Sequence, residues 1–285
     1  MTSPAVARRR LGAELRRLRI DADIPVEKAA EALECSPSKI SRLETGVGVP
    51  RTRDVRDLID LIGGEADQLR DELLGLAEEG RAQAWYHEFS DVLDSSLERF
   101  IDLESGASEE LVFGGAWLPG LLQTPEYAEA LFRAFDPDMS DDDVRRYVDL
   151  RMGRKGVLTR RRGPLRLTAI VDESVLLRAV GDPGVMRGQL GSLRAMAQEP
   201  PAGNVEVRLF PFAAGVHELL VADLTVLRFE DDDDVVLSEG HTAQGFEERP
   251  AEVESLIATF RSARERTLGG AELGDRLTTL IDRLG

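Results

Sequence analysis

The residues best suited to chemistry in this chain of 285 residues form a short polar and basic run at positions 38–42. Ser38, Lys39, Ser41 and Arg42 carry groups that donate or accept hydrogen bonds. Such groups can contact base edges in the DNA major groove, where each base pair presents its own pattern of donors and acceptors. On one face of a helix, these side chains would therefore read a duplex.

The elements that must position this run are short helices within the first 63 residues. Leucines spaced by four and three residues predict a helix over about residues 7–20, and Pro25 opens a second over about 26–33. Ser36 and Pro37 have the N-cap and first-turn types that open a third helix, which Thr45-Gly46 ends. The predicted inward positions are Leu11, Leu15, Leu18, Ala29, Ala30, Leu33, Ile40, Leu43, Val55, Leu58, Ile59 and Ile62. This order predicts an all-α helix-turn-helix bundle.

The net charge differs between the predicted helical region, residues 1–63, and the rest of the chain. The whole chain has a net charge of −17, yet residues 1–63 hold 12 basic and 10 acidic side chains, so the rest carries about −19. Such an asymmetry indicates an interaction module on an acidic body. The single cysteine, Cys35, excludes an intrachain disulfide, and no apolar run reaches a membrane span. We therefore expect a cytoplasmic protein of two domains, residues 1–80 and 81–285, with the boundary near residues 78–83.

The N-terminal string resembles the DNA-binding domain of Xre-type (lambda-repressor-like) regulators. The matching residues are Leu15-Arg16, Leu18-Arg19, Ser36, Ile40-Ser41, Glu44, Gly46 and Pro50. The resemblance implies that Pro37, Ser38, Lys39, Ser41 and Arg42 face bases, and that Arg51 and Arg53 meet phosphates. It also implies a structural role for Glu44, paired with Arg16 or Arg19.

Some positions depart from that family pattern. Val26 stands where the family often has a phosphate-binding glutamine, and Val47 and Val49 stand where polar or basic residues are common. Affinity for DNA scales with the number of phosphates neutralised, so we expect modest affinity and a shallow salt dependence for one domain. The acidic body is expected to weaken non-specific binding further. The few phosphate contacts and the acidic body both favour a dimer or a partner-assisted complex.

The remaining two thirds of the chain mixes helical and alternating patterns, which predicts an α+β domain with a small mixed sheet of four to five strands. Helices are expected at about 65–78, 85–101, 125–135, 141–160, 172–180, 184–199, 250–267 and 272–284. Strands are expected at 111–117, 165–171, 205–210, 219–229 and 235–237. The Asp231–Asp234 run is interpreted as a solvated hairpin tip.

This second region is similar to the domain of unknown function that follows an Xre-like helix-turn-helix in WhiJ-like actinobacterial regulators. The hallmark is V-P-G-L-L-Q-T, present at residues 118–124 with Leu118 in place of valine. The resemblance implies transcriptional control and small partner proteins encoded nearby. We also expect a homodimer. The candidate effector or partner region comprises Gln123, Thr124, Tyr127, Arg154 and Lys155. The basic cluster at 151–162 leaves two interpretations open, a solvated helix end or an anion or partner site.

No catalytic motif stands out. His87, His217 and His241 do not form H-E-x-x-H, and the glycine-rich phosphate and nucleophile motifs are absent. Asp172-Glu173 is interpreted as a helix start rather than as paired acids. We expect neither an enzyme, nor a cofactor, nor a metal site.

Three hypotheses follow from the sequence. The first is a dimeric, sequence-specific DNA-binding transcriptional regulator whose second domain dimerises or senses a ligand or small protein. The second is an interaction module that mainly binds a small partner protein, with weak or conditional DNA binding. The third is a ligand-sensing or enzymatic body with a pocket that the sequence does not reveal.

Overall fold

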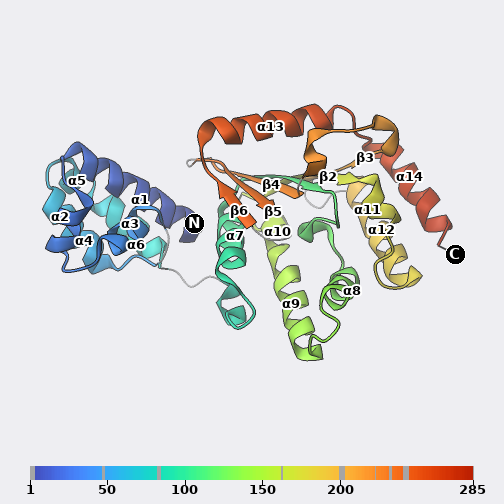
Figure 1. Cartoon of the computed structure of the whole chain (residues 1–285), viewed down its shortest axis with the longest axis horizontal. Coiled ribbons are helices and arrows are strands. Elements are labelled where there is room, and N and C mark those ends of the chain that lie inside the picture. The colour runs from blue at the N-terminus through green and yellow to red at the C-terminus, as the bar shows by residue number, and fades with distance from the viewer. Residues whose placement is uncertain are drawn as a thin grey trace. The chain divides into compact units, whose positions relative to one another are not determined.

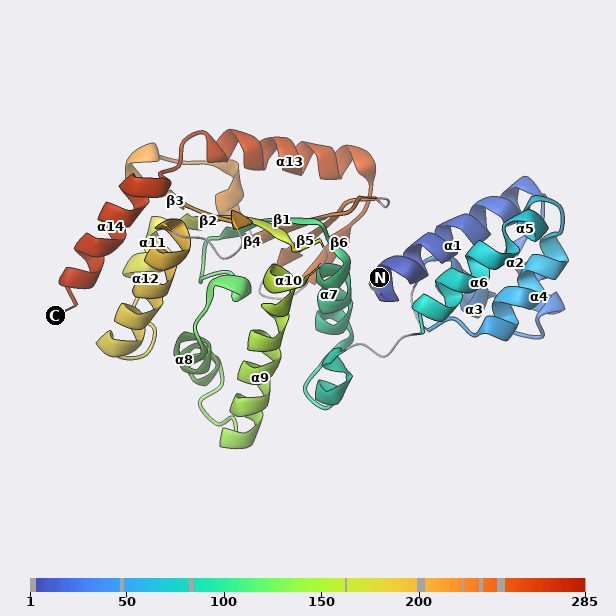
Figure 2. The ribbon, with the colours of Figure 1, turned by 180° about the vertical axis from the view of Figure 1, so that it is seen from behind.

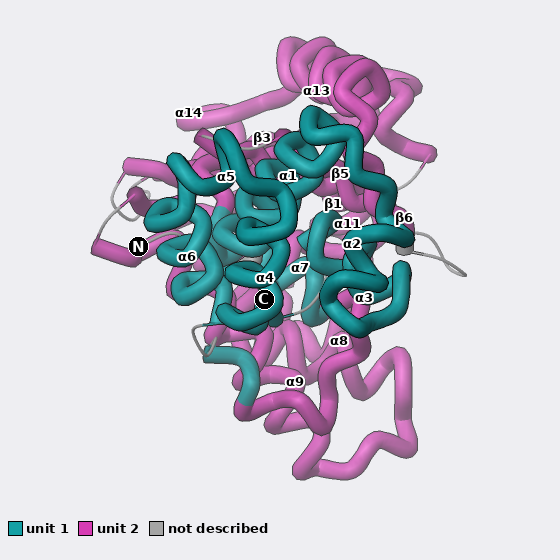
Figure 3. The backbone as a smooth tube through the Cα atoms, turned by 90° about the vertical axis from the view of Figure 1, so that its left-hand side faces the viewer, with its two compact units in different colours: residues 1–87, 98–106 teal, residues 88–97, 107–285 magenta. Residues whose placement is uncertain are grey.

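The computed structural model describes residues 4–46, 49–81, 85–161, 163–198, 203–221, 223–230, 233–239 and 244–284. The chain forms two compact units, residues 1–87 with 98–106 and residues 88–97 with 107–285 (Figure 3). Ala82 and Gln83, in the segment predicted to hold the domain boundary, lie outside the described residues. The division at residues 80 and 81 stays a prediction.

Helices make up the N-terminal part of the first unit, as the sequence predicts (Figure 1). Two glycines with positive φ, Gly63 and Gly64, end one helix and turn the chain into the next. The predicted helix over 65–78 is present as two segments, with Leu69 between them. The bounds are α1 Pro4–Asp21, α2 Val26–Ala32, α3 Pro37–Glu44, α4 Thr52–Ile62, α5 Glu65–Gln68 and α6 Arg70–Glu79.

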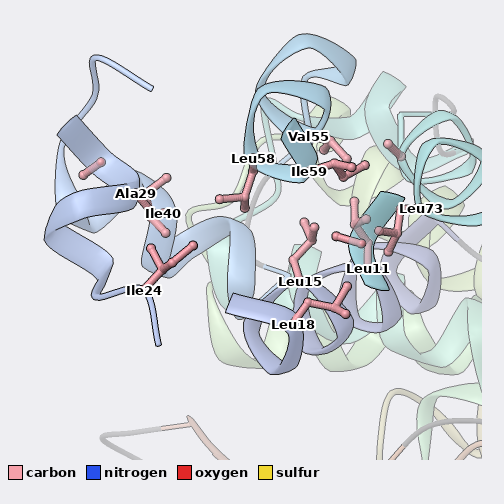
Figure 4. Close-up of a cluster of buried hydrophobic side chains, with 13 residues drawn as sticks. Leu11, Leu15, Leu18, Ile24, Ala29, Ile40, Val55, Leu58, Ile59 and Leu73 are labelled. Carbon is pink, nitrogen blue, oxygen red and sulfur yellow. The ribbon is translucent and has the colours of Figure 1, made fainter. Parts of the chain in front are cut away.

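The core of this unit comes from the apolar positions that share a helix face. Figure 4 shows Leu11 and Leu15 of α1 pointing toward the apolar side chains of α4, and Leu18 belongs to the same buried cluster. Leu15 and Leu58 have no exposed surface. Burial of a leucine side chain contributes about 1.5–3 kcal/mol, so these contacts fix where α3 and α4 lie on α1.

A mixed sheet forms the centre of the second unit, which confirms the predicted α+β class. Its order is β3-β2-β1-β4-β5-β6, with β1, β2 and β3 parallel and the remaining neighbours antiparallel. In the register, Phe113 lies opposite Ile170 on one side and Leu224 on the other. The bounds are β1 Glu109–Gly114, β2 Arg166–Asp172, β3 Val205–Phe210, β4 Asp223–Arg228, β5 Val235–Glu239 and β6 Gln244–Glu247.

Helices cover both faces of this sheet. Figures 1 and 2 show α13 along one face and α9 and α12 on the other. Ile257 and Phe260 of α13 pack with Phe113 and Ile170 in one buried cluster. The bounds are α7 Ser95–Gly106, α8 Pro125–Phe135, α9 Asp141–Arg154, α10 Gly156–Thr159, α11 Glu173–Leu177, α12 Pro183–Gln198, α13 Pro250–Arg264 and α14 Gly270–Asp282. Short 3-10 turns are η1 Trp85–Phe89, η2 Gly120–Leu122, η4 Phe212–Ala214 and η5 Glu218–Val221.

Three sequence predictions for this region are wrong in detail. The helix expected over 85–101 is a 3-10 turn followed by α7, because the Asp94 carboxylate accepts the backbone N–H groups of Ser96 and Leu97 and opens a new helix there. The strand expected from 219 begins at 223, after η5. Strand β6 was not predicted, since it has four residues and includes Gly245.

Candidate nucleic-acid interface

The start of α3 is set by local chemistry. The Ser36 hydroxyl accepts a hydrogen bond from the Lys39 backbone N–H at 3.3 Å, and Pro37 occupies the first turn. Ile40 is 1% exposed and anchors the helix from behind. The side chains on the other side of α3 are therefore directed away from the core.

A four-residue turn, residues 33–36, joins α2 to α3. Glu34 adopts a left-handed backbone conformation there, with φ of 49°, and the Cys35 N–H donates to the Ala30 carbonyl at 2.9 Å. Ala29 and Ala30 are buried, so α2 and α3 cross with small side chains between them. Helix, tight turn and second helix with an exposed outer face are the parts of a helix-turn-helix.

A buried ion pair locks the end of α3 to α1. Arg19 Nε donates to Glu44 Oε1 at 2.5 Å, and Arg19 Nη2 donates to Glu44 Oε2 at 2.9 Å. Its remaining terminal nitrogen donates to the Ile24 carbonyl at 2.6 Å. The hydrogen bonds that Arg19 donates to the Glu44 carboxylate raise the pKa of Arg19. The family resemblance left Arg16 and Arg19 as alternative partners of Glu44. In the structure, Arg16 is exposed and Arg19 forms the ion pair with Glu44.

Two glycines, of which the sequence analysis identified only Gly46, allow this close contact. A Cβ atom on Gly12 of α1 would lie 2.6 Å from the carbonyl oxygens of Leu43 and Glu44. Gly46 has φ of 69°, and a Cβ there would lie 2.8 Å from Arg9 Cα. Gly46 was predicted to end the helix, whereas Gly12 gave no sequence signal beyond its place between two leucines.

The outer face of α3 presents the side chains that the sequence singled out. Pro37, Ser38, Ser41 and Arg42 are exposed. Lys39 is half-buried, because its ammonium group forms an ion pair of 2.5 Å with the Asp54 carboxylate of α4. Sequence reasoning missed Asp54, which lies in the first turn of α4 and gave only the signal of an acid near a helix start.

The predicted phosphate contacts lie next to this face. Arg51 and Arg53 are exposed, and Arg53 forms a weak pair of 3.4 Å with Asp57 of the same helix. A shallow hollow between α3 and α4 is lined by Ser38, Lys39, Arg42, Val49, Arg51 and Asp54. Val49 is 60% exposed, and Val47 lies outside the described residues.

The motif residues of the second unit are placed differently. Gln123 has no exposed surface. Its side-chain amide donates to the Leu118 carbonyl at 2.6 Å and accepts from Arg151 Nη1 at 2.9 Å, and its backbone carbonyl accepts from Lys155 Nζ. Burial lowers the pKa of Lys155. Gln123 therefore fastens the 118–124 segment to α9.

The neighbouring motif residues complete the same attachment. Thr124 is the N-cap of α8, and its backbone N–H donates to Gln189 Oε1 of α12 at 2.7 Å. Tyr127 is 1% exposed. Arg154 is 8% exposed, and its guanidinium lies against Gly120. A Cβ atom at Gly120 would lie 2.9 Å from Arg154 Nη1. The structure thus brings the five candidate effector or partner residues together, most of them in the interior.

Other candidate groups have structural surroundings. Asp172 is the N-cap of α11 and accepts the Ser174 N–H at 2.9 Å, which confirms the predicted helix start. His217 is buried between Phe113 and Phe210, whereas His241 lies outside the described residues. Within the described ranges, no three His, Cys, Asp or Glu side chains are grouped to hold a metal ion. Among those same residues, every helix is too short or too polar to cross a bilayer.

The helical unit and its exposed polar face define the class, a helix-turn-helix protein, which suggests a DNA-binding regulator. Two family models agree with this division: one described as a helix-turn-helix domain matches residues 10–73, and one described as a domain of unknown function (DUF5753) matches residues 97–278. The second match spans more than half of the chain, so the protein belongs to the DUF5753 family. Comparison with curated proteins and with solved structures gave no match.

Proposed function

We propose that this protein is a sequence-specific transcriptional regulator of the Xre type that acts in the cytoplasm and inserts α3 into the major groove of an operator. The observation that carries the proposal is the arrangement of α3. Ile40 and Glu44 anchor it to the core, while Ser38, Ser41 and Arg42 remain exposed on its outer side. An anchored helix with short polar and basic outer side chains fits the dimensions and hydrogen-bonding pattern of that groove.

Pro37, Ser38, Lys39, Ser41 and Arg42 are the residues proposed to face bases. Arg51 and Arg53 are proposed to contact phosphates. Val26 supplies no phosphate ligand at the start of α2. Each phosphate neutralised adds about 0.9 to the slope of log affinity against log salt, so the slope of one unit is expected to be shallow.

The test is selection of an operator from a random duplex pool with the full chain, followed by fluorescence titration at stated salt. Arg42→Ala is expected to weaken binding to the selected duplex by about 1–3 kcal/mol, as for an arginine bidentate to guanine. Arg16→Ala, on an exposed side of α1, serves as the charge-matched control. Unchanged operator affinity in the Arg42 variant would refute its base-reading role.

The second unit is proposed to form a homodimer. Two copies of α3 would then contact half-sites about 34 Å apart, one turn of DNA. Phe212, Val216, Leu220 and Val221 are between 48% and 89% exposed within ten residues of this unit. Large exposed apolar side chains in one segment are typical of association surfaces. Sedimentation velocity on Val216→Asp and Val221→Asp tests whether self-association depends on them.

The same exposed segment favours a second function, an interaction module for a small partner protein. In that case the wild-type chain would be monomeric, and operator binding would require the product of a neighbouring small gene. Copurification with that product, lost in the Val221→Asp variant, distinguishes this function from homodimerisation. Ligand sensing at Gln123 and Lys155 would need a ligand that replaces their internal hydrogen bonds, because both side chains already have protein partners.

A further inference from the structure

One cation of the proposed DNA-reading face already has a protein counter-ion. Lys39 Nζ lies 2.5 Å from Asp54 Oδ2, with side chains 42% and 16% exposed. We propose that Asp54 is a specificity-determining residue that positions Lys39 to read a base and keeps its ammonium group from pairing with phosphates. This inference rests on the proposed function and concerns the same face.

Asp54 is a rigid point of attachment. It lies in the first turn of α4, and the next residue, Val55, has no exposed surface, as does Leu58 one turn later. Lys39 instead has a long, flexible stem with an ammonium group that carries three donors. Once Asp54 accepts one of these hydrogen bonds, the side chain is ordered before DNA arrives. Its two other donors remain for the O6 and N7 acceptors of a guanine.

The neighbouring cations differ from Lys39 in this respect. Within the described ranges, no carboxylate forms an ion pair with Arg42 or Arg51. These two arginines thus retain their full attraction for the duplex. Beside them, the Asp54 carboxylate offsets the charge of Lys39 and repels phosphates. Lys39, Arg42, Arg51 and Asp54 line the same hollow. This hollow therefore attracts DNA less strongly than its three basic side chains would without the carboxylate.

The consequence is expected in binding rather than in stability. A partly exposed ion pair contributes little to folding, since solvent screens it and two side chains must be ordered. Non-specific DNA binding, by contrast, depends almost entirely on the cations that are available to phosphates. Withholding one cation lowers non-specific affinity and leaves the base contact intact, which raises the ratio of specific to non-specific affinity.

The experiment uses the full chain and two duplexes of equal length, the operator selected from a random pool and a mixed sequence, titrated over a series of salt concentrations. Asp54→Asn is expected to bind the mixed sequence several-fold more tightly. Its salt slope is expected to steepen by about 0.9, one extra phosphate. Discrimination against a substitution at one operator base pair is expected to fall by about tenfold, the lower part of the range for one base contact. Asp60→Asn removes the same charge two turns along α4, where Asp60 pairs with Arg70, and is expected to match wild type.

Two further variants separate positioning from charge. Asp54→Glu keeps the carboxylate on a longer arm, so the salt slope should stay near wild type while discrimination falls. In a Lys39→Ala background, Asp54→Asn should no longer change discrimination, because the side chain that Asp54 positions is absent. Circular dichroism checks that each variant is folded. If Asp54→Asn does not fold, Asp54→Glu still tests the proposal.

The outcomes are distinct. Asp54→Asn behaving like Asp60→Asn would overturn this inference alone, as would an equal loss of discrimination with and without Lys39. A wild-type chain that selects no sequence from the pool would overturn the proposed function and this inference together.

Discussion

The outer face of α3 and the 118–124 segment both carry polar side chains that the sequence singles out, yet these side chains occupy opposite surroundings. Ser38, Ser41 and Arg42 are exposed on a helix whose apolar side is fixed to the core. Gln123 has no exposed surface, and its amide and backbone carbonyl are bonded to Leu118, Arg151 and Lys155. The first set has hydrogen-bonding capacity to offer a partner, whereas the second uses that capacity to hold its own unit together.

This difference in exposure shows that a distinctive motif with polar side chains does not by itself mark a binding site. A buried amide must be hydrogen-bonded, because an unsatisfied polar group in the interior costs about 1–3 kcal/mol. An internal polar network therefore constrains sequence as strictly as a ligand does. Burial of the 118–124 residues favours a structural role over a binding role, and the following substitutions test that distinction.

The largest expected effect is at Glu44, the buried residue behind the exposed face of α3. Glu44→Ala leaves the Arg19 guanidinium buried without its counter-ion, which is expected to cost about 3–5 kcal/mol in the free energy of unfolding. Urea unfolding of the full chain, monitored by circular dichroism, measures it. Glu31→Ala, an exposed residue of α2, is the control. A loss below about 1 kcal/mol, which is the value of an exposed ion pair, would contradict the assigned role.

The next effect is at the 118–124 segment. Gln123→Ala removes the acceptor of Arg151 and the donor to Leu118, so we expect a loss of about 1–3 kcal/mol in stability of the second unit. Gln198→Ala, on an exposed position of α12, is the control and should unfold at the wild-type urea concentration. Wild-type stability of the Gln123 variant, together with loss of a partner or ligand, would make the segment a binding site after all.

A third test concerns a buried group that lacks such a network. His217 is 8% exposed, and neither ring nitrogen has a hydrogen-bond partner among the described residues. Burial lowers the pKa of His217 from 6.5; the nearby Asp172 opposes this effect and Arg266 adds to it. The unfolded chain then binds this proton more readily than the folded one. Stability attributable to His217 is present above pH 6.5 and is lost as the pH falls below it.

For one proton, this loss is at most about 1.4 kcal/mol per pH unit. His217→Phe, which keeps an aromatic ring between Phe113 and Phe210, is expected to flatten the decline measured between neutral and mildly acidic pH. His87→Phe, a half-buried residue in η1, is the matched control. An equally steep decline in the His217 variant would show that other groups account for the pH dependence.

The smallest effect is expected where a polar side chain is exposed and bonded only to its neighbours. Arg133 of α8 pairs with Glu129 and Asp141 at the surface. Because solvent screens such pairs, Arg133→Ala should leave the urea midpoint unchanged within measurement error. A clear loss of stability would show that exposed polar side chains can also hold their unit together, so that exposure alone does not separate them from buried residues such as Gln123.

The local chemistry of the first unit was predictable because its signals lie close together in the chain. Ser36 and Pro37 set the start of α3, and the leucine spacing in α1 set its inward face. Partners distant in sequence were harder to predict. The choice of Arg19 over Arg16, the need for Gly12 and the pairing of Lys39 with Asp54 all depend on how helices cross.

In the second unit, the alternation of apolar residues predicted β3 and the α+β class, but not β6 or the break before α7. Short edge strands and local caps carry weak periodic signals. The role of Gln123 was equally hidden, since its partners Arg151 and Lys155 come from α9 and its neighbour Thr124 is tied to α12.

The sequence alone determined that the first unit is helical, where α3 begins and that its outer side would be polar, because caps and periodicity act over a few residues. Tertiary structure alone decided which polar groups remain exposed and which form internal hydrogen bonds. Burial and pairing depend on contacts between segments far apart in the chain, and a carboxylate such as Asp54 acquires its role only when folding brings Lys39 beside it.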